Sequence, residues 1–129
     1  NYFEVTIVNP GEKTMIGVGL ADQDHFPATK HMPGWIDHSY GYHGDDGRKF
    51  GPGSTEGTWD KWQDGDVIGC GFDCQRSTIW YTRNGMLLGD GFTGVTETKL
   101  VPVVGFHSNG ESVRVNFGLA PFVYTVRMV

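Results

Sequence analysis

Alternation of apolar and polar residues with a period of two is the feature that most constrains this chain. In the first such segment, residues 2–8, every second position is apolar: Phe3, Val5 and Ile7. The same alternation returns in Thr14–Leu20 and Ser112–Phe117, and no segment sustains the 3.6-residue period of a helix. Because successive side chains of a strand point to opposite faces, this pattern predicts half-buried strands. We therefore expect an all-β chain.

Turn signals separate the alternating segments. Asn9-Pro10-Gly11-Glu12 lies between the first two, so we expect Tyr2–Val8 and Thr14–Leu20 to form an antiparallel pair. Asn84-Gly85 follows Ser77–Arg83, and this dipeptide favours the type I′ turn of a two-residue hairpin. Gly supplies 20 of the 129 residues, a length that suits one domain. Together these signals predict a single antiparallel β-sandwich.

Apolar runs between turns predict the remaining strands, which are Ser39–His43, Val67–Asp73, Met86–Leu88, Leu100–Phe106 and Pro121–Val126. Leu100–Phe106 is nearly all apolar, which is typical of a strand covered on both faces. Pro121–Val126 is expected to be the last, edge strand.

Charge and cysteine usage exclude several classes of function. The net charge is −5 and the ten Lys and Arg residues are scattered, whereas a nucleic-acid binder needs a clustered basic surface. No apolar stretch approaches the ~20 residues that span a bilayer, and no signal peptide opens the chain. On one strand Cys70 and Cys74 would lie about 13 Å apart, too far for a disulfide. Free thiols favour a reducing compartment.

Residues that suggest catalysis or metal binding have unsuitable spacing. The five His residues form no H-x-x-x-H or H-E-x-x-H motif, and no Ser lies in a G-x-S-x-G motif. Asp45 and Asp46 are possible calcium ligands, but Gly44-Asp45-Asp46-Gly47 is more typical of a tight turn. We therefore expect no enzyme activity, no metal and no cofactor.

A series of short motifs, in order along nearly the whole chain, resembles SPRY domains. The motifs are Tyr2-Phe3-Glu4-Val5, Ile16-Gly17-Val18-Gly19-Leu20, Pro33-Gly34-Trp35, Ser39-Tyr40-Gly41-Tyr42-His43-Gly44-Asp45-Asp46-Gly47, Gly65-Asp66-Val67-Ile68-Gly69-Cys70-Gly71, Tyr81-Thr82-Arg83-Asn84-Gly85, Pro102-Val103-Val104-Gly105 and Val115-Asn116-Phe117-Gly118. Within the family, the chain resembles the Ran-binding-protein scaffolds of CTLH/GID-type ubiquitin ligases and fungal SPRY adaptors of a ubiquitin ligase. Secreted SPRY effectors of plant-parasitic nematodes are a third relative.

This resemblance implies a concanavalin-like jelly-roll sandwich, with residues 1–129 forming one SPRY domain. Family members carry further strands before the Tyr-Phe-Glu-Val strand, so we expect either that those first strands are missing here or that the numbering starts inside the domain. Inward-facing positions of the alternating strands, together with positions that lie in the core of the family, predict one set of core rings: Phe3, Trp35, Tyr40, Tyr42, Trp62, Phe72, Phe106 and Phe117.

The resemblance also implies a shallow binding platform made by loops at one end of the sandwich. The ring after the Asp-Asp-Gly turn corresponds to Phe50, and the loop after the Pro-Val-Val-Gly strand corresponds to His107-Ser108-Asn109. Arg48 and the Ala21–His31 loop would complete the rim. Phe26, Phe50 and Trp59 lie in loop-like sequence, where a large ring can anchor a partner.

The predicted function is non-catalytic recognition of a protein or peptide partner, such as recruitment to a ubiquitin ligase. The alternatives are a carbohydrate-binding, lectin-like module, a secreted SPRY effector, and a purely structural domain. We expect a monomer that contacts neither nucleic acid nor membrane. The expected location is the cytoplasm, with the cytosolic or lumenal part of an endomembrane adaptor as the alternative.

Overall fold

The computed structural model describes residues 1–26 and 31–125. This part of the chain contains strands and no helix. The strands are β1 (Tyr2–Pro10), β2 (Ile16–Asp22), β3 (Ser39–His43), β4 (Lys49–Phe50), β5 (Val67–Asp73), β6 (Thr78–Arg83), β7 (Met86–Phe92), β8 (Leu100–Phe106) and β9 (Glu111–Asn116). It follows that no described helix is long and apolar enough to cross a membrane.

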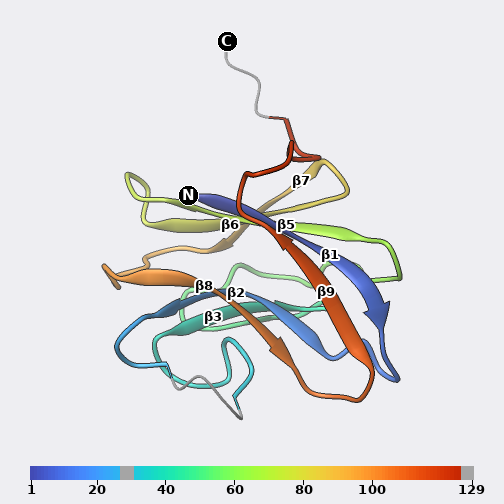
Figure 1. Ribbon diagram of the computed structural model, residues 1–129. Helices are drawn as coiled ribbons and strands as arrows, with labels where there is room; N and C mark the ends of the chain where they lie inside the picture. Colours follow the sequence, from blue (N-terminus) through green and yellow to red (C-terminus); the bar gives the residue numbers. More distant parts are fainter. Residues whose placement is uncertain (27–30, 126–129) are drawn as a thin grey trace.

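Two sheets face each other in the sandwich (Figure 1). The large sheet has the order β7-β6-β5-β1-β9, and the small sheet has the order β4-β3-β2-β8. Their strand pairs are antiparallel. The predicted antiparallel β-sandwich is therefore confirmed.

The predicted pairing of the first two strands is wrong. β1 pairs with β5 and β9 in the large sheet, whereas β2 pairs with β3 and β8 in the small sheet. The turn between them, residues 11–15, carries the chain from one sheet to the other. Each strand alternates because it faces the shared core from its own side, and alternation does not show which strand lies next to it.

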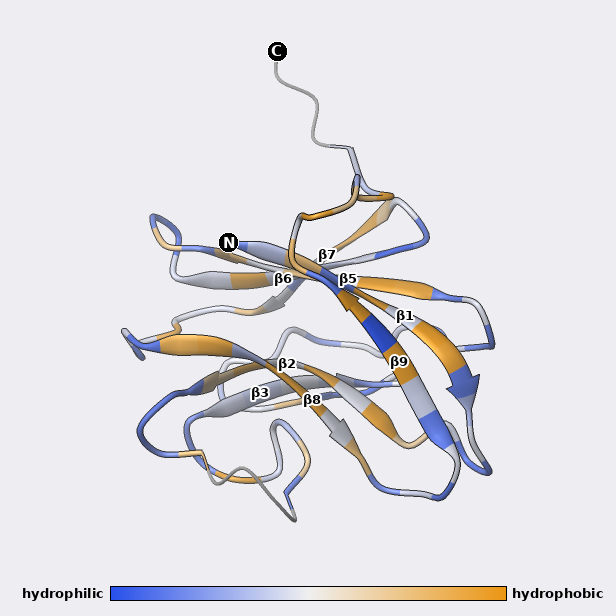
Figure 2. Cartoon of the chain, viewed as in Figure 1, coloured by the Kyte–Doolittle hydropathy of each residue, from blue (hydrophilic) through white to orange (hydrophobic). Residues whose placement is uncertain are grey.

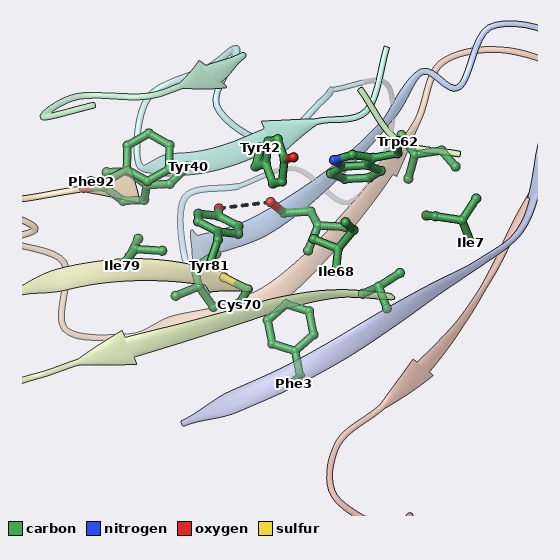
Figure 3. Packing of buried hydrophobic residues seen from close by; sticks show 14 of the residues in the cluster. Phe3, Ile7, Tyr40, Tyr42, Trp62, Ile68, Cys70, Ile79, Tyr81 and Phe92 are labelled. Carbon is green, nitrogen blue, oxygen red and sulfur yellow. Dashed lines mark hydrogen bonds between the residues drawn. The ribbon is translucent and has the colours of Figure 1, made fainter. Parts of the chain in front are cut away.

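The core between the sheets is formed by the inward rows of the strands (Figure 3). β1 contributes Phe3, Val5 and Ile7, as predicted, and all three are buried. The Tyr81 hydroxyl on β6 donates a 3.0 Å hydrogen bond to the Val18 carbonyl on β2, so it links the two sheets. Hydrophobic residues concentrate in the strands and hydrophilic ones in the connecting turns (Figure 2).

The hairpin predicted at Asn84-Gly85 is confirmed. β6 and β7 pair on either side of it, and both residues have positive φ, 51° for Asn84 and 81° for Gly85. A type I′ turn needs this conformation at both central positions. The prediction that Cys70 and Cys74 do not bridge is also confirmed, because both are free.

Several predictions of burial are wrong. β8 is an edge strand of the small sheet, so its outer face is partly open and Phe106 is 48% exposed. Phe117 is 66% exposed because β9 ends at Asn116, one residue before it. Trp35, assigned to the core, is 45% exposed in the connection between β2 and β3.

The predicted last strand, Pro121–Val126, does not form within residues 121–125, and Val126 lies outside the described residues. Residues 121–125 instead continue from β9 across the outer side of the large sheet toward β7 (Figure 1). Side-chain contacts rather than a backbone ladder hold this segment, as described below.

Candidate functional site

The segment Met32–Trp35 lies directly on the outer face of the small sheet. Glycines in the strands below make this approach possible. A Cβ atom added at Gly41 would lie 2.3 Å from the Pro33 carbonyl oxygen, and one at Gly105 would lie 2.6 Å from Pro33 Cδ. Met32 and Pro33 are buried as a result, and the chain rises from the sheet at Trp35.

Hydrogen bonds hold this segment in place. The buried His43 ring on β3 donates from Nε2 to the Pro33 carbonyl, 2.8 Å away, because a carbonyl can only accept. The Ser39 hydroxyl accepts a bond from the Gly34 amide at 2.8 Å and donates to the Ile36 carbonyl at 2.7 Å. The turn that carries Trp35 is therefore fixed on both sides.

The electrostatics of His43 favour its neutral form. Burial lowers the pKa of His43, and the hydrogen bond to Pro33 and the carboxylates of Asp45 and Asp46 oppose this shift only in part. A neutral ring beneath the surface keeps one donor for the Pro33 carbonyl without placing a charge in the packed layer.

Trp35 brings together two of the residues predicted from the sequence. Its ring lies edge-on to Phe50 on β4, 6.2 Å between centroids, and edge-on to His107 after β8, at 5.2 Å. His43 packs beneath, 5.6 Å from Trp35 and 4.4 Å from Phe50. Trp35 and His107 are exposed and Phe50 is half-buried; we call these three residues the Trp35 surface.

Three hydrogen bonds to Glu111 hold the loop that carries His107. The Glu111 carboxylate accepts hydrogen bonds from the backbone amides of His107 and Ser108, at 3.1 and 3.0 Å. It also accepts one from the Ser108 hydroxyl at 2.6 Å, so this hydroxyl is already used within the loop. Asn109 is exposed, and its carbonyl accepts a bond from the Glu12 amide at 3.2 Å.

Arg48 lies on the turn that leads to Phe50 and has an exposed side chain. Its backbone amide donates to Asp46 Oδ1 at 2.9 Å, and its carbonyl accepts the His43 amide at 3.0 Å. Asp46 thus stabilises the turn, the role that the sequence favoured over calcium binding.

Two predicted residues lie away from the Trp35 surface. Phe26 lies in the turn after the last residue of β2, beside Val101 and Pro102 at the start of β8, whereas His107 bonds to Met15 just before β2. A seven-residue strand spans about 20 Å, so Phe26 belongs to the other end of the small sheet.

Trp59 is half-buried and packs against the core. Its ring lies 5.1 Å from Tyr42 and 5.7 Å from Tyr81, and Lys49 Nζ lies 4.3 Å from its centroid. Lys49 and Phe50 are consecutive on β4 and point to opposite faces, so Trp59 and Phe50 belong to different sides of the strand.

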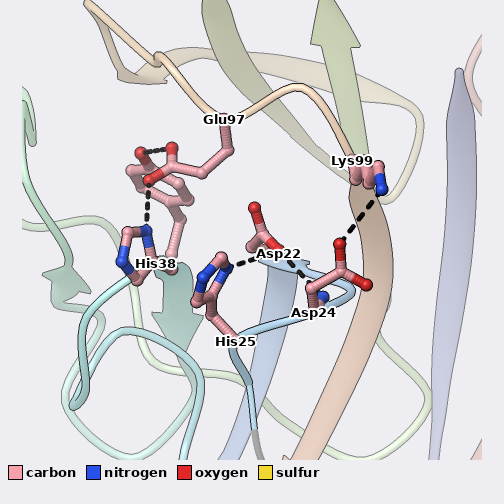
Figure 4. A network of polar contacts seen from close by, with 7 residues as sticks. Asp22, Asp24, His25, His38, Glu97 and Lys99 are labelled. Atoms are coloured by element: carbon pink, nitrogen blue, oxygen red, sulfur yellow. Dashed lines mark hydrogen bonds and ion pairs between the residues drawn. The ribbon is translucent and has the colours of Figure 1, made fainter.

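A polar network at the far end of the small sheet joins the connection between β2 and β3 to the connection between β7 and β8 (Figure 4). His25 Nδ1 donates to Asp22 at 3.0 Å, and His38 Nδ1 donates to Glu97 at 3.2 Å. The Tyr40 hydroxyl also donates to Glu97. The rings of His25 and His38 are 4.6 Å apart, but across residues 1–26 and 31–125 no group of three or more His, Cys, Asp or Glu is arranged to hold a metal ion.

Residues 1–120 match the family model of the SPRY domain. The chain belongs to the SPRY family. SPRY domains are protein–protein interaction modules, and the predicted resemblance is confirmed. Ran-binding protein 9 of Xenopus tropicalis is 43% identical over 128 residues, covering 97% of this SPRY chain and 22% of that protein. Human Ran-binding protein 9 is 44% identical over 128 residues, covering 97% of this chain and 17% of that protein.

Solved structures agree with this SPRY assignment. A crystal structure of a human SPRY domain superposes with a TM-score of 0.80 at 36% identity, covering 94% of this chain and 78% of the other. The chain spans about a fifth of the length of the curated relatives named above.

Trp35 is the residue of this SPRY surface that sequence reasoning missed. Its position in Pro33-Gly34-Trp35 predicts a core ring, and its exposure contradicts that prediction. However, it follows a long polar stretch without alternation, which is the same signal that selected Phe26 and Trp59 as loop aromatics. The lack of alternation extends over residues 21–35, so the same criterion also selects Trp35 as a loop aromatic.

Proposed function

We propose that this SPRY domain binds a short segment of a partner protein across the Trp35 surface. The observation that carries the proposal is the Trp35 ring, which is 45% exposed. Hydrogen bonds to His43 and Ser39 hold the segment that carries this ring, and Glu111 holds the neighbouring His107 loop. Tryptophan is enriched among the residues that dominate binding energy, and a stiff surface loses little entropy on binding.

The chemistry around Trp35 indicates the ligand class. Phe50 and Trp35 offer apolar ring surface to one aliphatic, proline or aromatic side chain, while His107 and Asn109 provide polar groups at the rim. The net charge of −5 favours neutral or basic segments. One or two buried side chains and backbone hydrogen bonds give micromolar affinity, about −8 kcal/mol.

The biological role that we propose is recruitment of a substrate or partner to a ubiquitin ligase. Support comes from the relatives, which are named as Ran-binding proteins, and from the motif resemblance to ligase scaffolds and adaptors. We propose a cytoplasmic location, with which the free thiols of Cys70 and Cys74 agree.

Panning a random peptide phage library on the domain tests this proposal. Peptides enriched on the wild-type domain are expected to bind Trp35→Ala and Phe50→Ala at least 10-fold more weakly. Met86→Ala is the matched control, because it removes an exposed apolar side chain from β7 on the other sheet.

Unchanged binding by Trp35→Ala, with circular dichroism showing an intact fold, would remove the Trp35 surface as the site. A glycan array probed with the same three variants covers the lectin alternative. Sugar binding that depends on Trp35, without enrichment of any peptide, would replace our proposal.

A further inference from the structure

The outer face of the large sheet carries a buried carboxylate that the Trp35 surface does not involve. Glu4 on β1 points away from the core, on the face where alternation predicts contact with solvent, yet it is only 3% exposed. No Lys, Arg or His of the described chain forms a salt bridge with it. A carboxylate removed from water without a cation needs several hydrogen-bond donors.

Those donors come from the segment after β9. Glu4 Oε1 accepts a hydrogen bond from the Val123 amide at 2.9 Å, and Oε2 accepts one from the Tyr124 amide at 3.0 Å. The Tyr2 hydroxyl donates the third, at 2.7 Å. One carboxylate therefore binds two consecutive amides of a segment about 120 residues away, and each of its oxygens accepts one of the two bonds. Such a bidentate contact fixes both the position and the direction of the segment.

Aromatic rings complete the contact. Tyr2 stacks on Trp80 of β6, with centroids 5.1 Å apart and planes at 8°. Phe122 meets the Tyr2 ring edge-on at 4.9 Å. Tyr124 lies 5.9 Å from Tyr2 and 5.7 Å from Trp80. Phe122 and Tyr124, alternate residues of the segment, thus pack on the rings of Tyr2 and Trp80, which we call the Tyr2–Trp80 platform. The amides of Val123 and Tyr124 reach Glu4.

The sheet is shaped for these rings. A Cβ atom at Gly69 would lie 2.0 Å from the Tyr2 hydroxyl, and one at Gly71 would lie 2.3 Å from Trp80 Cε2. Only glycine at both positions of β5 allows the two rings to lie flat on the sheet. The family model ends at residue 120, so the segment that occupies this platform lies beyond the part of the chain that the model matches.

We infer that Tyr2, Glu4 and Trp80 form a second peptide-acceptor site, on the opposite outer face from the Trp35 surface, and that residues 120–125 are its ligand. The site takes a bent segment that has aromatic residues at alternate positions, as in Phe122 and Tyr124, and directs two consecutive backbone amides to one carboxylate. Held in this way, the segment fixes where the chain leaves the sandwich. The inference does not depend on the proposed function of the Trp35 surface.

Hydrogen exchange on the full chain tests the role of Glu4. In Glu4→Gln one carboxylate oxygen becomes an amide NH₂, which cannot accept a bond. We expect the amides of Val123 and Tyr124 to exchange at least 10-fold faster, while the amides of β1 keep their protection. Glu12→Gln, on an exposed turn, is the matched control. Unchanged protection of both amides in Glu4→Gln would overturn the inference.

Supplying the ligand from outside tests the acceptor site itself. The double variant Phe122→Ala/Tyr124→Ala vacates the platform, and a synthetic peptide of residues 120–125 is then added. The peptide is expected to shift the NMR signals of the Trp80 indole and the Tyr2 amide, and to raise the melting temperature. Adding Glu4→Gln to the double variant is expected to weaken binding at least 10-fold.

Two outcomes of the peptide experiment would reject the acceptor site: a folded double variant that shows no shift, and binding that is insensitive to Glu4→Gln. If the double variant does not fold, the exchange experiment on the full chain decides. Wild-type protein should bind the added peptide at least 10-fold more weakly than the double variant, because its own segment is present at high effective concentration.

Discussion

Gly41→Ala directly perturbs the contact between β3 and the Met32–Trp35 segment, which carries the Trp35 ring. The added Cβ would lie 2.3 Å from the Pro33 carbonyl oxygen, whereas ordinary contact begins at 3.4 Å. The oxygen must therefore retreat by about 1.1 Å, the difference between the two. Because this oxygen accepts the hydrogen bond from His43, the retreat stretches that bond from 2.8 Å beyond normal length.

The expected loss of stability follows from three contributions. Overpacking costs about 1–3 kcal/mol, and the weakened buried hydrogen bond costs about 0.5–1.5 kcal/mol. Replacing glycine with alanine recovers about 0.4–1 kcal/mol by restricting the unfolded chain, because Gly41 does not have positive φ. We expect the free energy of unfolding to fall by about 2 kcal/mol.

Urea unfolding followed by tryptophan fluorescence measures this loss. With an m-value of about 2 kcal/mol/M, the midpoint should fall by about 1 M. Gly17→Ala is the graded control, because its Cβ would lie 3.1 Å from the His43 ring and from Pro33 Cδ, a contact that needs only a few tenths of an ångström of adjustment. An unchanged midpoint for Gly41→Ala, or equal losses in both variants, would refute the reasoning.

Three further predictions concern buried polar groups. Tyr81→Phe removes the hydroxyl bonded to Val18 and should lower the free energy of unfolding by about 1 kcal/mol in urea titrations; no loss would mean that the bond between the sheets adds nothing. Because the pKa of His43 is depressed below its usual 6.5, the unfolded state binds more protons as the pH falls through 6.5, so stability should decrease from there downwards. His43→Gln should flatten that slope between about pH 6.5 and pH 5, and an unchanged slope would assign it to other groups. Asp66→Asn weakens the 2.8 Å bond from Arg83 and should lower the free energy of unfolding by about 1.5–3 kcal/mol, measured as a lower melting temperature. A melting temperature equal to that of the wild type would contradict this.

Local patterns predicted most of the strands, because their causes are local. Alternation placed Phe3, Val5 and Ile7 on the inward face of β1, and the structure buries all three. Asn84 and Gly85 predicted their hairpin because they accept positive φ, a property of the residues themselves. The pairing of β1 with β5 and β9 was not predictable in this way, since alternation is the same whichever strand lies alongside.

The candidate site was predicted in part. Family positions predict Phe50 and His107 as site residues, and the structure brings both to Trp35, for which the same positions predict a place in the core. Phe26 and Trp59 satisfied the same loop criterion and lie elsewhere. Sequence position shows that a ring is in a loop, but the glycines beneath Met32–Trp35 determine where that loop lies.

The sequence alone determined the all-β class, the inward face of each alternating strand and the turn at Asn84-Gly85, because each depends on near neighbours in the chain. Only the tertiary structure decided what covers the outward faces. Glu4 alternates as a solvent-facing residue and is nevertheless buried, because a segment about 120 positions later donates two amides to it. Burial of an outward side chain depends on distant residues that pack against it, and a periodic pattern carries no information about them.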